Sequence, residues 1–362
     1  MRFSLAGMSG SDDYDALLFP EPATRAFWLG VRKFFQDTYP LQFTAALCIS
    51  SIGIPLNLFH IMVLARKNMM TSSTNVILLG IAFSDISLLI VDFEVSATFY
   101  FRKWTRERAE CEAPYSFARM HLDRILNCLG SFSLNNSVWL VILLSIIRVL
   151  VVKNPLNPIS NRLSSIRFGL ISVLLVFLFC SPLSILSLFQ YRLQPLRTWR
   201  PARSCPEFPE NYTTVQYFFE QNGWFGEQEV VKTKLFLEGL LYQFTPAVVL
   251  PLTSLLLILE VRKHKRRNGS VSEDRSLRDR STNLVLFMTF SFLLADIPVT
   301  VLTFSQSFLY SSLGFRQTTA YVCTMFRILM MFDATVHCLI CFFMSSHYRN
   351  TVKEILGKRV RN

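Results

Sequence analysis

Acidic side chains occur inside long apolar stretches of this sequence, where ionisable groups are costly and point to a function. They are Asp85, Asp92, Glu94, Asp296 and Asp333, and His337 follows the last of these by four residues. We predict that Asn57, Asp85, Ser137, Asp333 and His337 converge on one polar cluster. Carboxylate oxygens suit hard cations, so such a cluster can hold water, a proton or a monovalent cation. The alternative for each acid is a protonated carboxyl group that is hydrogen-bonded to a neighbour.

The composition is that of an integral membrane protein. Of the 362 residues, 51% are hydrophobic and only 17% are charged, which lies outside the range of soluble globular domains. No HExxH, GxSxG or phosphate-binding glycine loop appears, so the sequence does not indicate an enzyme. The eight cysteines form no metal-binding pattern, and we expect neither a metal nor a cofactor.

Apolar segments long enough to span a bilayer follow one another along the chain. The seven segments are Leu41–Ala65, Thr74–Phe99, Ile125–Val152, Phe168–Phe189, Leu235–Val261, Leu284–Phe304 and Tyr321–Met344. We therefore predict an all-α membrane protein, a seven-transmembrane helix bundle over residues 41–344. An N-terminal tail over residues 1–40 precedes it, and residues 345–362 hold a short amphipathic helix along the membrane interface.

Basic residues beside the helix ends predict the orientation. The first, third and fifth segments end at Arg66-Lys67, Lys153 and Arg262–Arg267. By the positive-inside rule these ends lie in the cytoplasm, so the N-terminal tail is extracellular. Polybasic segments next to a membrane also attract anionic lipids. The basic surface adjoins the spans and lacks interleaved aromatic residues, so we expect no nucleic acid as a partner.

Two outer loops follow from this orientation. One contains Cys111 and the other, about Gln190–Lys234, contains Cys205 and the sequon at Asn211. An asparagine on the outer side is a glycosylation site. The two cysteines face the oxidising side, where either a disulfide joins them or both thiols stay unpaired. The long second loop is either a lid over a pocket or disordered, and its aromatic residues favour a lid.

The chain resembles rhodopsin-like G-protein-coupled receptors from about Leu41 to Leu356. The stretches that carry the resemblance are Met70–Asp85, Ile147–Pro158, Leu255–Lys263, Leu284–Pro298 and His337–Ser346. It is most similar to the nematode serpentine chemoreceptor class W, which is related to FMRFamide-type and myosuppressin-type neuropeptide receptors. The resemblance implies a receptor in the plasma membrane that crosses it several times.

The resemblance also implies roles for single residues. Asn57 and Asp85 correspond to the polar anchors of the first two helices, with Asp85 at the position of the sodium site. Arg148 corresponds to the arginine of the Asp-Arg-Tyr motif, and Cys111 and Cys205 correspond to the conserved disulfide of these receptors. Coupling to the G protein would therefore involve Arg148 and the basic third inner loop, with Arg262, Lys263 and Lys265.

The sequence departs from the family pattern at several switch positions. Ile147 and Val149 replace the acid and the aromatic residue beside the arginine, so the usual restraint is missing and basal activity is expected. Asp296 stands where most relatives have Trp, two residues before the sixth-helix proline, Pro298. His337 begins a segment that replaces Asn-Pro-x-x-Tyr. We take Asp296 and Pro298 as the candidate switch residues.

The favoured function is a receptor for an extracellular ligand that signals through a heterotrimeric G protein. A short FMRFamide-like neuropeptide is the first candidate ligand, and Asp123 or Glu220 can pair with its arginine. A small environmental chemical is the alternative. An ion-coupled or proton-coupled transporter is less favoured, because the chain has no internal repeat and only 13 Gly.

Overall fold

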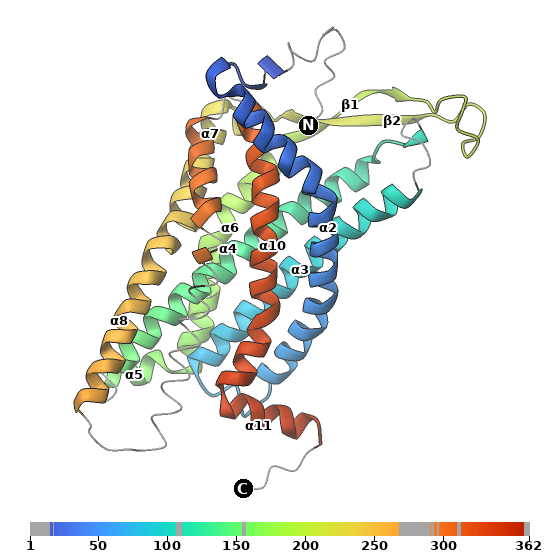
Figure 1. Cartoon of the computed structure of the whole chain (residues 1–362). Coiled ribbons are helices and arrows are strands. Elements are labelled where there is room, and N and C mark those ends of the chain that lie inside the picture. Colours follow the sequence, from blue (N-terminus) through green and yellow to red (C-terminus); the bar gives the residue numbers. More distant parts are fainter. Residues whose placement is uncertain are drawn as a thin grey trace.

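The structure is a computed structural model that describes residues 15–16, 18–105, 111–153, 157–267, 290, 293–294, 297–309 and 313–357. These residues are mostly helical (Figure 1). Six of their helices are long and apolar enough to cross a membrane, in agreement with the predicted membrane protein. Ten of the 21 residues of the predicted span Leu284–Phe304 lie outside the described residues, so the number of seven helices stays a prediction.

Long helices make up most of the fold. They are α2 (Pro22–Leu64), α3 (Ser73–Thr105), α4 (Phe117–Lys153), α6 (Ile166–Phe189), α8 (Thr245–Arg267) and α10 (Leu313–Met344). The shorter elements are α5 (Pro158–Leu163), β1 (Tyr191–Trp199), β2 (Thr214–Gln221), the 3-10 turn η2 (Gly223–Gly226), α7 (Gln228–Glu238), the π-helical turn η3 (Gly239–Phe244) and α11 (Ser346–Ile355). Residues 297–308 are also helical.

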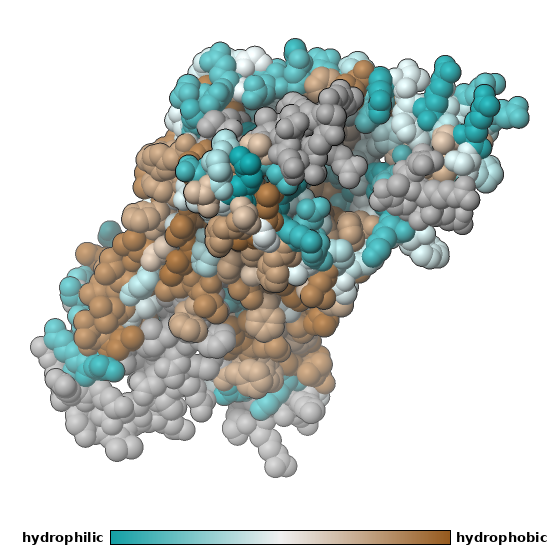
Figure 2. All heavy atoms as spheres, turned by 45° about the horizontal axis from the view of Figure 1, so that its top comes forward, coloured by the Kyte–Doolittle hydropathy of each residue, from teal (hydrophilic) through white to brown (hydrophobic). Residues whose placement is uncertain are grey.

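The long helices form a bundle around α3. This helix packs against α2, α4, α6 and α10, and α10 also packs against α2. The strands lie at one end of the bundle and α11 at the other (Figure 1), and we call these the hairpin end and the α11 end. Apolar side chains cover the middle of the visible face, while hydrophilic ones gather at the hairpin end (Figure 2). This distribution fits a bundle whose middle lies in a bilayer.

The first long helix starts earlier than the sequence predicts. Residues 1–40 are expected to form a tail, but α2 begins at Pro22. Proline suits the first turn of a helix, because its missing N–H would have no partner there. Arg32, Lys33 and Asp37 make the added stretch too polar for hydrocarbon. Hydropathy therefore detects only the apolar part of a helix that is longer than the bilayer requires.

The loop between α6 and α7 contains two strands, which the predicted all-α bundle does not include. β1 and β2 pair antiparallel, with Leu193 opposite Phe219 and Arg192 opposite Glu220. The sequence of β2, Thr-Val-Gln-Tyr-Phe-Phe-Glu-Gln, is rich in the β-branched and aromatic residues that favour strands. The loop predicted to be a lid or disordered is thus largely an ordered hairpin.

The π-helical turn η3 joins α7 to α8 within one continuous rod. Such turns hold one residue more than a regular helical turn and are rare. Within η3, Tyr242 is buried, and its hydroxyl donates to the carbonyl oxygen of Phe179 on α6 at 3.1 Å. After it, the hydroxyl of Ser145 on α4 donates to Thr253 on α8 at 2.8 Å. The irregular turn therefore lies between two contacts that fix this rod to its neighbours.

Candidate functional site

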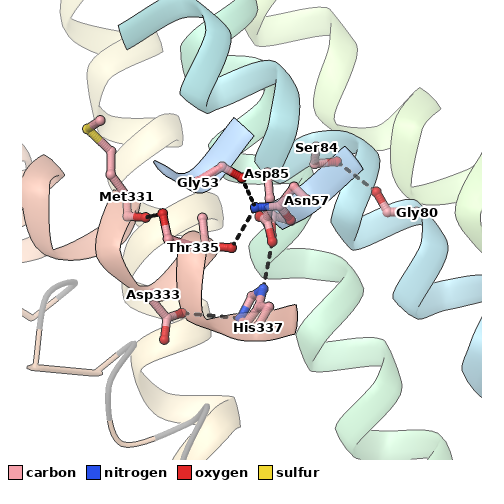
Figure 3. A network of polar contacts seen from close by, with 11 residues as sticks. Gly53, Asn57, Gly80, Ser84, Asp85, Met331, Asp333, Thr335 and His337 are labelled. Carbon is pink, nitrogen blue, oxygen red and sulfur yellow. Dashed lines mark hydrogen bonds and ion pairs between the residues drawn. The ribbon is translucent and has the colours of Figure 1, made fainter. Parts of the chain in front are cut away.

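Asp85 is the centre of a buried polar cluster in the middle of the bundle (Figure 3). Its Oδ1 accepts a hydrogen bond from the hydroxyl of Ser137 on α4 at 2.8 Å. Its Oδ2 lies 2.6 Å from Nδ1 of His337 on α10. One carboxyl group of α3 therefore connects three helices.

Asp333 faces the other ring nitrogen of His337. Its Oδ2 lies 3.4 Å from Nε2, which is an ion-pair distance, and the two residues are one turn apart on α10. The side chains of Asp333 and His337 are only 13% and 7% exposed. A cavity of about 30 Å³ adjoins both, and Asp85 and Ser137 also line it. That volume is enough for a water molecule.

Asn57 lies beside this cluster on α2. Its side-chain nitrogen donates to the carbonyl oxygens of Gly53 and Ala334, each at 3.1 Å, so it joins α2 to α10. Its hydrogen bonds among the described residues do not include Asp85. The structure thus brings four of the five predicted cluster residues into contact and places the fifth next to them.

Two further acids of α3 are paired with arginines that the sequence analysis does not identify as partners. Asp92 lies 2.9 Å from Nε of Arg327 on α10, and Glu94 lies 2.5 Å from Nη1 of Arg119 on α4. Arg327 passes close to Gly130 of α4, where an added Cβ would lie 2.6 Å from Nη2. Arg327 falls inside a predicted span, and a base in that position needs an acid. Applied to bases as well as acids, this rule would have found the pair.

The residues predicted to contact a G protein lie toward the α11 end. Arg148 is half-buried on α4, and no hydrogen bond or ion pair joins it to another described residue. Ile147, where these receptors have an acid, is buried. Arg262 and Lys263 are exposed in the last turns of α8, and the side chain of Lys265 lies outside the described residues. Arg148 therefore has no acidic partner among the described residues.

Of the two predicted switch residues, the structure describes only Pro298. Pro298 lies half-buried in the helical residues 297–308. Asp296 lies outside the described residues. The switch role of both stays a prediction.

The features predicted for the outer loops lie at the hairpin end. A disulfide joins Cys111, shortly before α4, to Cys205 in the loop between β1 and β2. Asn211 is exposed in the same loop with a φ of 69°. Asparagine adopts this left-handed conformation more readily than most residues, and a sugar acceptor must be exposed. Glycosylation at Asn211 stays a prediction.

A groove of about 1080 Å³ opens at the hairpin end between α2, α3, the residues after the disulfide and the two strands. Aromatic side chains line much of it, namely Tyr39, Phe43, Phe99, Tyr115, Trp199 and Tyr217. Arg102, Lys103, Glu112 and Arg197 add charge to the lining, and Arg102 forms an ion pair with Glu112. Aromatic walls with a few polar groups are typical of a small-ligand site.

Helix α11 is fixed to the bundle by Tyr348. The Tyr348 hydroxyl shares a hydrogen bond of 2.8 Å with Nδ1 of His60 on α2, and both side chains are buried. Burial raises the pKa of the Tyr348 phenol above its ordinary value, so the hydroxyl keeps its proton. Thr351 and Val352 are buried on the same face of α11. One face of this short helix therefore packs on the α11 end of the bundle.

The sequence of nearly all of these elements matches a known protein family. The profile of the family described as "Serpentine type 7TM GPCR chemoreceptor Srw" matches residues 44–359. The chain belongs to this family. No curated protein matches it. The predicted similarity to serpentine chemoreceptors is confirmed, while the relation to FMRFamide-type receptors stays a prediction.

The family gives the polar cluster its context. A Srw chemoreceptor is a multi-pass membrane protein of the G-protein-coupled type, and its family is one of receptors rather than enzymes. Receptors of this type bind an extracellular ligand and act on a G protein. In this Srw chemoreceptor, the Asp85 cluster lies along the helices between the hairpin end and the α11 end.

Proposed function

We propose that this chain is a plasma-membrane chemoreceptor with its hairpin end outside the cell and its α11 end in the cytoplasm. A ligand bound at the hairpin end would change the affinity of the α11 end for a heterotrimeric G protein. Such coupling requires two states of the bundle that differ in affinity for both partners. The family match over residues 44–359 carries the proposal. The disulfide at the hairpin end and the basic end of α8 support the orientation.

A small environmental molecule is the ligand class that we favour for the groove at the hairpin end. The chemoreceptor family supports it, and the aromatic lining suits it. An FMRFamide-like neuropeptide is the second candidate, on the predicted relation of this receptor class to FMRFamide-type receptors. Both acids expected to bind the arginine of such a peptide are already paired. Asp123 contacts Arg119 and Glu220 contacts Arg192, each at 2.8 Å.

The ligand class can be tested by screening. Cells that express the receptor with a promiscuous G protein would be exposed to small volatile and water-soluble chemicals and, separately, to amidated peptides. We expect responses to members of the chemical set. Responses confined to amidated Arg-Phe peptides would favour the neuropeptide alternative, and a bundle that responds to neither while moving ions would indicate a transporter.

Arg148 provides the test of G-protein coupling. The variant Arg148→Ala should reach the cell surface normally and lose most of the ligand-evoked and basal signal, because its guanidinium group has no structural partner in the described bundle. Second-messenger output normalised to surface receptor would measure this loss. Arg66→Ala is the matched control, since Arg66 is exposed beyond α2 at the same end. Undiminished signalling by Arg148→Ala would remove this residue from the coupling site.

A further inference from the structure

Arg327 is a base between the long helices that uses only one of its nitrogens to bind the protein. Its Nε lies 2.9 Å from Oδ1 and 3.1 Å from Oδ2 of Asp92 on α3. No hydrogen bond joins Nη1 or Nη2 to any other described residue. Arginine commonly binds a carboxylate through two nitrogens at once. The edge formed by Nη1 and Nη2, which we call the Arg327 fork, is therefore available to a second acceptor.

Arg119 shows what an arginine looks like when its whole fork serves the fold. It lies on α4 and also faces an acid of α3. Its Nη1 is 2.5 Å from Glu94, and its Nη2 is 2.8 Å from Asp123. Both terminal nitrogens of Arg119 thus have carboxylate partners, so this arginine has no free edge for a ligand.

The Arg327 fork lies inside the bundle, between α10, α3 and α4. A Cβ added to Gly130 on α4 would lie 2.6 Å from Nη2, so glycine leaves room for the guanidinium group. The side chain of Arg327 nevertheless remains 27% exposed. Charged groups within a membrane bundle face either a partner or a water-filled space. Arg327 does both, with Nε on Asp92 and the rest of the group accessible.

Asp92 and Arg327 lie just beyond the inner end of the groove at the hairpin end. Val95 lines the groove from α3, and Asp92 is on the same face of this helix, one turn further in. On α10, the ring of Tyr321 contacts the groove residue Tyr39, with 5.3 Å between the centroids. Arg327 follows Tyr321 by about 9 Å along the helix axis. A ligand that enters the groove can therefore reach the fork.

The charges that line the groove favour an anion. Its bases are Arg102, Lys103 and Arg197, and its acid is Glu112. The pair of Asp92 and Arg327 adds no net charge, so the positive excess of the lining remains. Such an excess attracts anions and repels cations.

We propose that the ligands of this chemoreceptor are organic anions and that the Arg327 fork binds their carboxylate group. The inference rests on the proposed receptor function and gives its ligand a chemical class. Two parallel hydrogen bonds from Nη1 and Nη2 match the two oxygens of a carboxylate. Asp92 holds the guanidinium group in position through Nε. The apolar body of the ligand lies along the aromatic lining of the groove.

Thermal unfolding of the purified full chain in detergent tests this site without a G protein. The probes are acetate, hexanoate, benzoate and phenylacetate, each compared with its primary amide at equal pH and ionic strength. A ligand that binds only the folded state raises the midpoint of unfolding. We expect at least one carboxylate with an apolar body to raise the midpoint by roughly 2 °C or more and its amide to leave it unchanged. If no carboxylate raises the midpoint above that of its amide, the proposal is wrong.

Substitution of Arg327 assigns the binding to the fork. Arg327→Lys keeps a cation beside Asp92 but loses the paired donors, so carboxylate affinity should fall by about tenfold or more. Arg119→Lys is the matched control and should bind as the natural chain does, because both terminal nitrogens of Arg119 are already occupied. If Arg327→Lys folds poorly, Asp92→Asn with Arg327→Gln repeats the test without unpaired charge. Unchanged carboxylate affinity in the folded Arg327 variants would remove this residue from the site.

Signalling in cells separates this inference from the proposed function. Carboxylates that raise the midpoint but evoke no second-messenger response would support the anion site and count against the receptor function. Responses confined to amines, alcohols or amidated peptides would support the receptor function and overturn the anion site.

Discussion

Helices α3 and α6 are both apolar enough to cross a membrane, yet they lie in very different surroundings. In the most apolar stretch of α3, 61% of the residues are buried, against 22% in α6. α3 carries three acids, of which Glu94 and Asp92 face arginines of other helices and Asp85 faces His337. α6 carries a single charged residue, Arg167, in its first turn. The comparison shows that hydropathy identifies a span but does not tell whether it lies at the centre of the bundle or at its edge.

The buried faces of the two helices also differ in the size of their side chains. The buried residues of α6 are all small, namely Gly169, Ser172, Cys180 and Ser184. Small residues let membrane helices approach closely. Large side chains such as Leu174 and Leu175 are 57% and 60% exposed and would face lipid. α3 instead buries large side chains such as Leu88 and Leu89 together with its acids.

Among the substitutions that test the difference between α3 and α6, the removal of a cation that faces α3 should lower the stability most. Arg327→Ala leaves Asp92 unpaired among the helices, and an uncompensated buried charge costs about 3–5 kcal/mol. The thermal midpoint in detergent should fall accordingly. The double variant Asp92→Asn with Arg327→Gln should recover much of the loss, since no charge is left unpaired. A double variant less stable than Arg327→Ala would show that the pair acts in another way.

The second largest difference in stability should appear when one leucine on each of the two helices is shortened to alanine. Leu89 on α3 is completely buried, so Leu89→Ala should destabilise the bundle by about 2–5 kcal/mol through lost contacts and a cavity. Leu175→Ala on α6 should change the stability by less than about 0.5 kcal/mol, because an exposed side chain leaves no cavity. Unfolding curves for both variants give the difference. Equal losses would contradict the exposure of Leu175 and would mean that this face of α6 is buried in the native state.

The smallest loss of stability in this series should come from enlarging one of the small buried residues of α6. A Cβ on Gly169 would lie 2.9 Å from the Cα of Ser73, at the start of α3. Gly169→Ala should therefore cost about 1–3 kcal/mol, as overpacking does. Gly30 on α2 has open space around its Cα, so Gly30→Ala is the control and should not destabilise the chain. A neutral Gly169→Ala would indicate that α3 and α6 are less tightly packed than the structure has them.

The sequence predicts the membrane class and part of the site because both depend on local composition. Six spanning helices follow from apolar runs, and Asp85, Ser137 and His337 are conspicuous as polar residues within such runs. The contact of His337 with two acids at once could not be predicted, because it depends on how α10 is rotated against α3.

Other features are missed for different reasons. The start of α2 at Pro22 is invisible to hydropathy, because the helix continues through charged residues. The hairpin is missed because strand preference depends strongly on context and a loop between spans is expected to be irregular. The pair of Asp92 and Arg327 is missed because the predicted sites include the intramembrane acids but not the intramembrane bases.

The π-helical turn at Gly239–Phe244 has a consequence for the angular position of every residue after it. A regular helix advances by about 100° per residue, so one extra residue in a turn shifts the following side chains around the axis by about that angle. The residues of α8 that face the bundle are therefore rotated around the axis relative to the pattern that α7 alone would predict. Deleting one residue from the turn would swing Thr253 away from Ser145 and bring lipid-facing side chains against α4.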